Sequence, residues 1–304
     1  MADVEFARNG PVSIAYEAFG DLAHGRPLLL IMGLDFQMVW WPDGFVDRLV
    51  DAGFAVVRFD NRDTGLSTSF APIARPRPFR ALLGGVTPAY TSRDMLDDAL
   101  AVMDAVGWAD AHVLGGSMGA ALGQGLAMED PQRVRSLVSV MGAPADSGVL
   151  GMLRYVRPGV FRALARIRPG ETDEERVDAL VEIYRAVGAS PTYPFPEQWA
   201  RETARVSHAR HPRDQATTQR QLAAGRAHRF PGLATIAAPT LVISGLDDPL
   251  VHWTAGRDTA RRIPGARFVG HPGMAHAMPA ELFDEIVRDV QRLAVDADGP
   301  PART

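Results

Sequence analysis

Short segments made largely of apolar residues recur along this chain and alternate with stretches of helical periodicity. The apolar segments are residues 28–32, 54–59, 111–114, 134–141, 240–244 and 267–269. Helices are predicted over residues 45–52, 92–106, 119–128, 253–263 and 280–293, and an edge strand over residues 12–18. Strands that are apolar throughout are buried on both faces, as in a parallel sheet whose connections are helices. The pattern therefore predicts an α/β fold with a mostly parallel central sheet flanked by helices.

The alternation stops after Pro144, and the strands resume at Pro239. Residues 145–232 have helical periodicity and are rich in Arg, Tyr, Phe and Pro, without a convincing buried strand. We interpret this segment as a helical cap inserted into a core that comprises residues 1–144 and 233–295. Residues 296–304 are small, polar and Pro-containing, so we expect a disordered tail.

The composition excludes several classes of function. The formal net charge of -4 gives no overall basic field that would hold nucleic acid. The chain contains no Lys, which rules out Schiff-base chemistry on a side-chain amine. It also contains no Cys, which rules out a thiolate nucleophile and a Cys-bound metal. Nothing in the sequence points to a metal or to an organic cofactor.

Membrane and export signals are not recognised in the sequence. The longest apolar run, residues 28–32, is far shorter than the ~18 residues that a membrane span requires. The first residues carry acidic rather than basic side chains, and no apolar segment typical of a signal peptide follows before Pro11. We therefore expect a cytoplasmic protein that does not bind membranes, and the sequence leaves a homodimer open.

Ser117 is the strongest candidate for a nucleophile. Residues 115–119 read Gly-Gly-Ser-Met-Gly, directly after a predicted strand and directly before a predicted helix. In the pattern G-x-S-x-G the Ser occupies a sharp strand-to-helix turn, and the glycines two residues away on either side leave room for it. Such a pentapeptide also occurs by chance in Gly-rich chains, but the flanking elements favour the nucleophile interpretation.

A Ser hydroxyl needs a general base and a third group that orients the base. The acid is expected after the strand at residues 240–244, where Asp247 and Asp248 compete. We choose Asp248, because it lies further along the loop and can reach across, whereas Asp247 fits a solvated turn. The base is expected after the last strand, and we choose His276 over His271 because His271 directly precedes a proline at a strand end.

Acyl transfer also needs two backbone N–H donors for the oxyanion that forms. The residue after the nucleophile, Met118, supplies one of them in a turn of this kind. The other is expected from the loop that follows residues 28–32, where Leu34 is the candidate. Gly33 lets the backbone turn inward at that point.

Aromatic side chains near the predicted site suggest a pocket for a bulky, apolar substrate. The candidate pocket residues are Gly33, Trp40, Trp41, Tyr155, Phe161 and Trp199. Packing beneath the cap explains the aromatic residues equally well. Residues 60–67 are densely polar, and we interpret them as a turn whose Asp and Arg side chains tie loops together beneath the site.

These motifs together resemble the α/β-hydrolase superfamily over nearly the whole chain except the cap. The resemblance rests on the Ser elbow, the Gly-Leu-Asp-Asp-Pro and Gly-Met-Ala-His loops and the Asp-Asn-Arg-Asp-Thr-Gly-Leu-Ser turn. Within the superfamily the chain is similar to the aclacinomycin methylesterase-like group of actinobacterial esterases. That resemblance implies an α/β-hydrolase fold, Ser117, Asp248 and His276 as catalytic residues, and Leu34 and Met118 in the oxyanion hole. It also implies hydrolysis of a bulky, polyketide-like methyl ester through an acyl-enzyme.

Three other functions stay open at this point. A proline iminopeptidase-like aminopeptidase would hold the amino terminus of its substrate with acids of the cap, for which Glu171, Glu174 and Glu175 are candidates. A non-hydrolytic enzyme of polyketide biosynthesis would use the same pocket for decarboxylation, cyclisation or C–C bond formation. A ligand receptor that kept the fold would show slow single turnover without product release.

Overall fold

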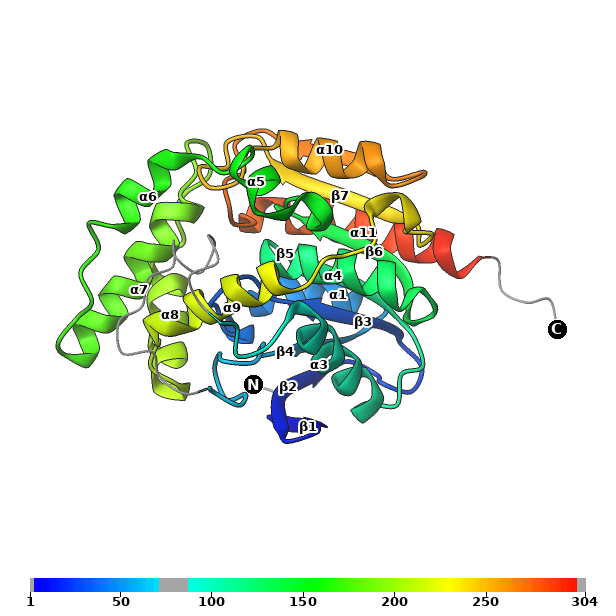
Figure 1. The fold of residues 1–304 in the computed structure, drawn as a ribbon, viewed down its shortest axis with the longest axis horizontal. Coiled ribbons are helices and arrows are strands. Elements are labelled where there is room, and N and C mark those ends of the chain that lie inside the picture. Colours follow the sequence, from blue (N-terminus) through cyan, green and yellow to red (C-terminus); the bar gives the residue numbers. More distant parts are fainter. Residues whose placement is uncertain (1–2, 71–86, 300–304) are drawn as a thin grey trace.

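The computed structural model describes residues 3–70 and 87–299, and within these ranges eight strands form one sheet (Figure 1). The strands are β1 (Glu5–Asn9), β2 (Val12–Phe19), β3 (Arg26–Ile31), β4 (Phe54–Phe59), β5 (Ala111–Gly116), β6 (Val134–Val140), β7 (Thr240–Gly245) and β8 (Arg267–His271). Their order across the sheet is β1-β2-β4-β3-β5-β6-β7-β8. From β4 to β8 all neighbours are parallel, whereas β2 is antiparallel to both β1 and β4. The predicted mostly parallel sheet is confirmed, and the carboxyl ends of its parallel strands lie along one edge.

The prediction that residues 12–18 form an edge strand is wrong. β2 lies between β1 and β4, and β1 is the outer strand, with Phe6 opposite Ala15 in the register. Gly10 has a φ of 57°, which allows the tight turn between the two strands. Of the five residues of β1 only Ala7 is buried, so this strand has no apolar run by which the sequence could reveal it.

Helices cover both faces of the sheet (Figure 1). One face is covered by α1 (Asp43–Asp51) and α11 (Phe283–Asp298), the other by α3 (Ser92–Ala105) and α4 (Met118–Glu129), and α10 (Thr254–Arg262) packs on β7 and β8. Alternate residues of β3 face the two layers, because Leu28 and Leu30 belong to the cluster with α1 and α11, and Leu29 and Ile31 to the cluster with α3 and α4. Burial on both faces therefore explains why this strand is apolar from Leu28 onward.

Five helices of the described ranges stand between β6 and β7, where the sequence predicts an inserted cap. They are α5 (Gly148–Leu153), α6 (Pro158–Leu164), α7 (Asp173–Gly188), α8 (Glu197–Arg210) and α9 (Gln215–Ala227). We refer to residues 145–232 as the cap segment. Helices α7 and α8 pack against each other and bury Trp40 from the core between side chains such as Val181 and Ala204 (left in Figure 1).

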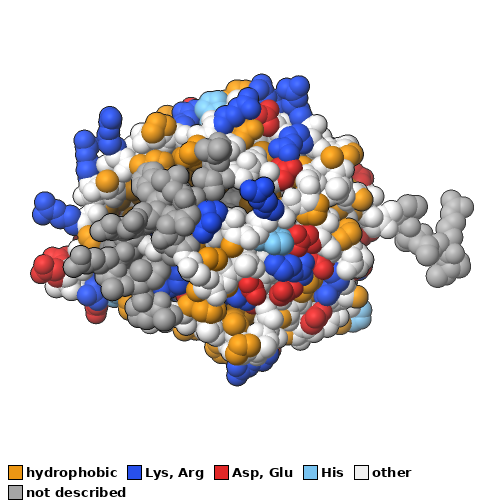
Figure 2. All heavy atoms as spheres, in the orientation of Figure 1, with side chains coloured by type: hydrophobic (Ala, Val, Ile, Leu, Met, Phe, Trp, Pro, Cys, Tyr) orange, Lys and Arg blue, Asp and Glu red, His pale blue; other side chains and the backbone are white. Residues whose placement is uncertain are grey.

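Short 3-10 helices complete the described ranges. They are η1 (Met38–Trp40), η2 (Pro131–Arg133), η3 (Ala145–Ser147), η4 (Leu233–Thr235) and η5 (Ala280–Leu282). None of the helices in the described part of the chain is both long enough and apolar enough to cross a membrane. Basic and acidic side chains are interspersed over the face shown in Figure 2, in keeping with the small net charge.

Part of the predicted disordered tail, residues 296–304, is helical. Helix α11 continues to Asp298, whose carboxylate accepts a hydrogen bond from Arg26 Nε at 3.1 Å. The two residues are 272 positions apart, so the contact that holds the end of the helix leaves no signal in the local sequence. The last five residues, 300–304, lie outside the described part of the chain.

Candidate active site

Ser117 lies on a sharp turn between β5 and α4. Its backbone has φ 56° and ψ -115°, a strained conformation for any residue other than Gly. Two glycines make the turn possible, because a Cβ on Gly115 would lie 2.1 Å from the Gly119 carbonyl oxygen. A Cβ on Gly119 would lie 2.0 Å from the carbonyl oxygen of Ile31. The strand, turn and helix are therefore arranged as the Gly-Gly-Ser-Met-Gly sequence predicts.

A chain of hydrogen bonds joins Ser117, His276 and Asp248. Ser117 Oγ lies 2.9 Å from His276 Nε2, and His276 Nδ1 lies 2.7 Å from Asp248 Oδ2. Asp248 is 2% exposed, and its Oδ1 accepts the backbone N–H groups of Leu250 at 2.7 Å and Val251 at 2.9 Å. Because the carboxylate can only accept, His276 donates from Nδ1 to Asp248, and its Nε2 is left to accept the Ser117 hydroxyl proton.

The two rival residues have other partners. Asp247 is exposed, and its Oδ2 accepts the backbone N–H of Gly273 at 2.8 Å, which ties the acid-bearing loop to the His-bearing loop. His271 is buried at the end of β8, with its Nδ1 3.9 Å from Glu285 Oε1. The structure therefore brings the preferred acid and base to Ser117 and leaves both rivals out of the hydrogen-bond chain.

The loop that follows β3 contacts the nucleophile. A Cβ on Gly33 would lie 3.2 Å from the Cβ of Ser117, so the loop backbone rests against this side chain. Leu34 comes next in the chain. Met118 is the first residue of α4, and its N–H is one of the amides that the helix cannot pair internally. Met118 thus directly follows Ser117, and Leu34 directly follows Gly33, whose backbone lies against the Ser117 side chain.

Asp35, directly after Leu34, is anchored to the cap segment. Its Oδ2 accepts a hydrogen bond from Thr218 Oγ1 at 2.6 Å and forms an ion pair with Arg213. Burial raises the pKa of the Asp35 carboxyl above its ordinary value, and the Arg213 guanidinium acts against that rise. The loop of the proposed oxyanion hole is therefore in direct contact with the region of α9.

An aromatic cluster lies between this loop and the cap segment. The ring of Trp40 is 5.0 Å from Phe36, 5.0 Å from Tyr184 and 5.8 Å from Trp199, measured between centroids. Burial raises the pKa of Tyr184. Sequence reasoning missed Tyr184, although Val177, Leu180, Val181 and Tyr184 form a stripe at helix spacing on α7.

Three of the candidate pocket residues lie outside this aromatic cluster. Trp41 is buried in the core beneath the Ser turn and stacks on Phe45 at 6.2 Å, so it lies outside the aromatic cluster. Tyr155 donates a hydrogen bond from its hydroxyl to Asp258 of α10 at 3.0 Å. Phe161 lies on α6 and is 40% exposed. Adjacent tryptophans thus point in opposite directions, Trp40 into the cap segment and Trp41 into the core.

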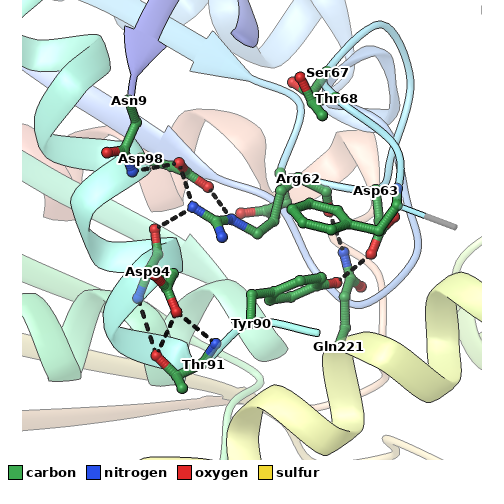
Figure 3. Close-up of polar contacts among 12 residues, drawn as sticks. Asn9, Arg62, Asp63, Ser67, Thr68, Tyr90, Thr91, Asp94, Asp98 and Gln221 are labelled. Carbon is green, nitrogen blue, oxygen red and sulfur yellow. Dashed lines mark hydrogen bonds and ion pairs between the residues drawn. The ribbon is translucent and has the colours of Figure 1, made fainter. Parts of the chain in front are cut away.

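The polar loop at residues 60–67 ties core loops together, as predicted (Figure 3). Arg62 makes two hydrogen bonds to the Asp98 carboxylate, at 2.6 and 2.8 Å, and Asp63 accepts the Tyr90 hydroxyl at 2.6 Å. Burial raises the pKa of Tyr90 strongly, and the Asp63 carboxylate adds to that rise. Among the described residues, no group of three or more His, Asp or Glu side chains is arranged to hold a metal ion.

The strand order, the Ser on its strand-to-helix turn and the His and Asp on later loops define the α/β-hydrolase class of enzyme fold. The chain belongs to the alpha/beta hydrolase fold family, which matches residues 22–281. It is 32% identical over 290 residues to rhodomycin D methylesterase DauP of Streptomyces sp. strain C5, covering 90% of this chain and 92% of that protein. It is 29% identical to the putative carbamate hydrolase RutD of Variovorax paradoxus strain S110, covering 94% and 98%. Its fold is similar to that of the enol-lactonase from Burkholderia xenovorans LB400, with a TM-score of 0.69 and 24% identity over 95% and 99% of the two chains.

Proposed function

We propose that this protein is a serine-dependent carboxylic ester hydrolase that works through an acyl-enzyme. The observation that carries the proposal is the hydrogen-bond chain from Ser117 through His276 to the buried Asp248. Acyl transfer to a serine needs a nucleophile, a base and a group that orients the base. Ser117, His276 and Asp248 are hydrogen-bonded to one another in that order. The similarity to a methylesterase over most of the chain supports the same reaction class.

The first half-reaction forms the acyl-enzyme. Ser117 Oγ attacks the carbonyl carbon of the ester while its proton passes to His276 Nε2. The carbonyl oxygen becomes an oxyanion, for which the N–H groups of Leu34 and Met118 are the proposed donors. The imidazolium, stabilised by Asp248, then gives its proton to the leaving alcohol oxygen as the C–O bond breaks. The alcohol departs, which is methanol for a methyl ester.

The second half-reaction releases the acid. A water molecule attacks the acyl carbon, and His276 Nε2 takes one of its protons. The tetrahedral intermediate collapses when the bond to Ser117 Oγ breaks, and that oxygen receives its proton back from His276. The carboxylic acid leaves, and the side chains return to the state in which the cycle began.

A bulky, apolar and polyketide-like methyl ester is the proposed substrate class. The rhodomycin D methylesterase relative supports a methyl ester. The aromatic cluster around Trp40, next to the oxyanion loop, supports an acyl group with a large flat surface, because aromatic rings pack well on one another. One relative is named as a putative carbamate hydrolase, so a substrate panel should also include carbamates.

The proposal is tested with a panel of p-nitrophenyl and methyl esters of increasing size. Turnover and the mass of the intact protein are followed for the parent chain, a Ser117→Ala variant and a His271→Ala variant. We expect Ser117→Ala to lose activity by a factor on the order of a thousand or more, and to show no acyl adduct. His271→Ala, which removes the rival histidine, should keep most of the activity of its folded fraction.

Two results would contradict the proposed ester hydrolysis. If the parent chain is inactive on every ester and carbamate, or if Ser117→Ala is as active as the parent, the non-hydrolytic or receptor function takes its place. Two of the three candidate cap acids give the aminopeptidase alternative no support. The Glu175 carboxylate accepts backbone N–H groups at the start of α7, and Glu174 pairs with Arg201 and Arg205. Turnover of a proline arylamide would reverse that conclusion.

A further inference from the structure

The loop that carries Leu34 adopts a conformation that its own residues do not favour. Asp35 has a φ of 63°, in the left-handed region where Gly is the favoured residue. The Phe36 N–H lies 3.5 Å from the Gly33 carbonyl oxygen, which closes a tight turn with Leu34 and Asp35 at its centre. A turn with positive φ at its third residue normally has Gly or Asn there. Contacts from outside the turn must therefore hold Asp35 in place.

Two side-chain amides supply such contacts, one on each side of Leu34. Gln221 of α9 accepts the Asp35 N–H on its Oε1 at 2.9 Å. Asn61 Nδ2 donates to the Met32 carbonyl oxygen at 3.0 Å. The backbone on both sides of the proposed oxyanion donor is therefore hydrogen-bonded to a side chain from another part of the fold.

Gln221 is itself held firmly. It is 2% exposed, and its Nε2 donates to the Arg62 carbonyl oxygen at 3.1 Å; Figure 3 shows it projecting from α9 toward Arg62. Both ends of the amide are thus in use, which fixes which atom faces Asp35. Arg62 in turn is anchored by its two hydrogen bonds to Asp98. The Gln221 side chain that contacts Asp35 is therefore held in place by hydrogen bonds to the core.

Because the peptide bond is planar, the contact from Gln221 to Asp35 also restrains the backbone of Leu34. The Asp35 N–H and the Leu34 carbonyl belong to one trans peptide, so they point in opposite directions. While Gln221 binds the N–H, this peptide cannot rotate, and the Leu34 carbonyl stays on the side away from Gln221. Rotation would change ψ of Leu34 and φ of Asp35 and open the turn in which the Phe36 N–H faces the Gly33 carbonyl oxygen. The Leu34 N–H lies in the same peptide as that carbonyl, so its orientation depends on the closed turn.

We propose that Gln221 is a positioning residue, which holds the oxyanion loop in the conformation that donates the Leu34 N–H. This inference rests on the proposed ester hydrolysis. It makes helix α9 of the cap segment a part of the catalytic apparatus, in addition to any role in covering the substrate. Turnover then requires α9 to be seated against the loops that follow β3 and β4.

The test compares Gln221→Ala with Gln198→Ala, a substitution of the same type at an exposed position of α8. Stopped-flow release of p-nitrophenolate from a p-nitrophenyl ester gives both the rate constant of acylation and the burst amplitude. We expect Gln221→Ala to lower the rate constants of acylation and deacylation together, about 10- to 100-fold, because the oxyanion hole serves both half-reactions. KM and the burst amplitude depend on the ratio of these two rate constants, so each should change less than about twofold. Gln198→Ala should behave as the parent.

A double-substitution cycle separates positioning from general damage. Gly adopts positive φ without strain, so the Asp35→Gly variant should hold the turn with less help. We expect Gln221→Ala to cost less than about threefold in acylation rate in the Asp35→Gly background. A simple structural role of Gln221 would give the same loss in both backgrounds.

Each outcome has a defined meaning. The inference is overturned if Gln221→Ala leaves the acylation rate constant unchanged, if it lowers only the burst amplitude, or if its effect is equal in both backgrounds. A parent chain whose ester turnover does not depend on Ser117 overturns the proposed function and this inference together. Ser117-dependent turnover that is indifferent to Gln221 overturns this inference alone.

Discussion

At the scale of single residues, Asp248 shows how burial gives a carboxylate a defined direction. Its Oδ1 is occupied by two backbone N–H groups of its own loop, and its Oδ2 faces His276 Nδ1 at 2.7 Å. The side chain therefore cannot turn away without losing these bonds in a buried setting, where unpaired polar groups are costly. The His276 ring is held in one orientation as a result.

Asp248→Asn tests this role with little change in shape. The amide of Asn can donate to His276 Nδ1, which favours the tautomer that carries its proton on Nε2 and cannot accept from Ser117. We expect kcat to fall by about 10³- to 10⁴-fold while the circular dichroism spectrum is unchanged. Asp247→Asn is the matched control and should lose less than about threefold. Equal losses in the two variants would contradict the assignment of the acid.

At the scale of elements, buried ion pairs join the cap segment to the core. Three core aspartates from the loops after β3 and β4 each pair with an arginine near or on α8 and α9: Asp35 with Arg213, Asp60 with Arg210, and Asp63 with Arg220. Burial of charges is tolerated only when each has a partner and hydrogen bonds. These pairs therefore fix the end of α8 and the start of α9 on the core.

Arg210→Met tests the strength of this attachment. The variant leaves the Asp60 carboxylate, whose side chain is 0% exposed, without the guanidinium that now lies 2.7 Å away. We expect the free energy of unfolding to fall by about 3 kcal/mol in urea titrations, because an uncompensated buried charge is costly. Asp60→Asn combined with Arg210→Met should recover part of the loss.

The matched control for that measurement is Arg205→Met on the same helix. Arg205 pairs with Glu174 at 2.8 Å, but both side chains are more than half exposed. Exposed pairs contribute about 0–1 kcal/mol, so little change is expected. If Arg205→Met destabilises the protein as much as Arg210→Met does, burial of the Asp60 pair is not what makes it important.

At the scale of the whole molecule, a charged cluster joins the end of helix α11 to the amino ends of the central strands. These ends lie opposite the active site. His112 near the start of β5 is buried, with Nδ1 2.9 Å from Ser136 Oγ and Nε2 3.3 Å from Asp298 Oδ1. Arg26 and Arg135 also pair with Asp298. Burial lowers the pKa of His112 to about 4, and the two arginines act in the same direction while Asp298 opposes them.

This pKa shift predicts how stability depends on pH. The folded state keeps His112 neutral, whereas the unfolded chain binds a proton below its ordinary pKa near 6.5. The contribution of neutral, buried His112 to the free energy of unfolding is therefore fully present above about pH 6.5. It is lost as the pH falls toward about 4. Between about pH 7.5 and about pH 5, we expect the parent to lose about 2 kcal/mol more unfolding free energy than His112→Asn. The exposed His24→Asn should follow the parent, and identical pH curves for all three proteins would contradict the assignment.

Local patterns were sufficient for the parallel part of the sheet and for the nucleophile. The run at residues 28–32 is apolar, and the run at residues 54–59 is apolar apart from Arg58, because both faces of the sheet are covered, and that requirement is visible in the sequence itself. The Ser117 turn is equally local, since the steric need for Gly115 and Gly119 arises within a few residues of the strand end. The sequence by itself therefore determined the α/β class, the elbow and the chain order of acid and base.

Tertiary structure decided which side chains meet. Asp248 and Asp247 are neighbours of one type, and only the folded loop turns one toward His276 and the other toward Gly273. Gln221 and Asp35 are 186 positions apart, so their contact has no counterpart in any local periodicity. Composition and spacing specify what a segment can become, because they act over a few residues. The partners of a buried polar group depend on where distant segments come to rest, and this only the packed fold determines.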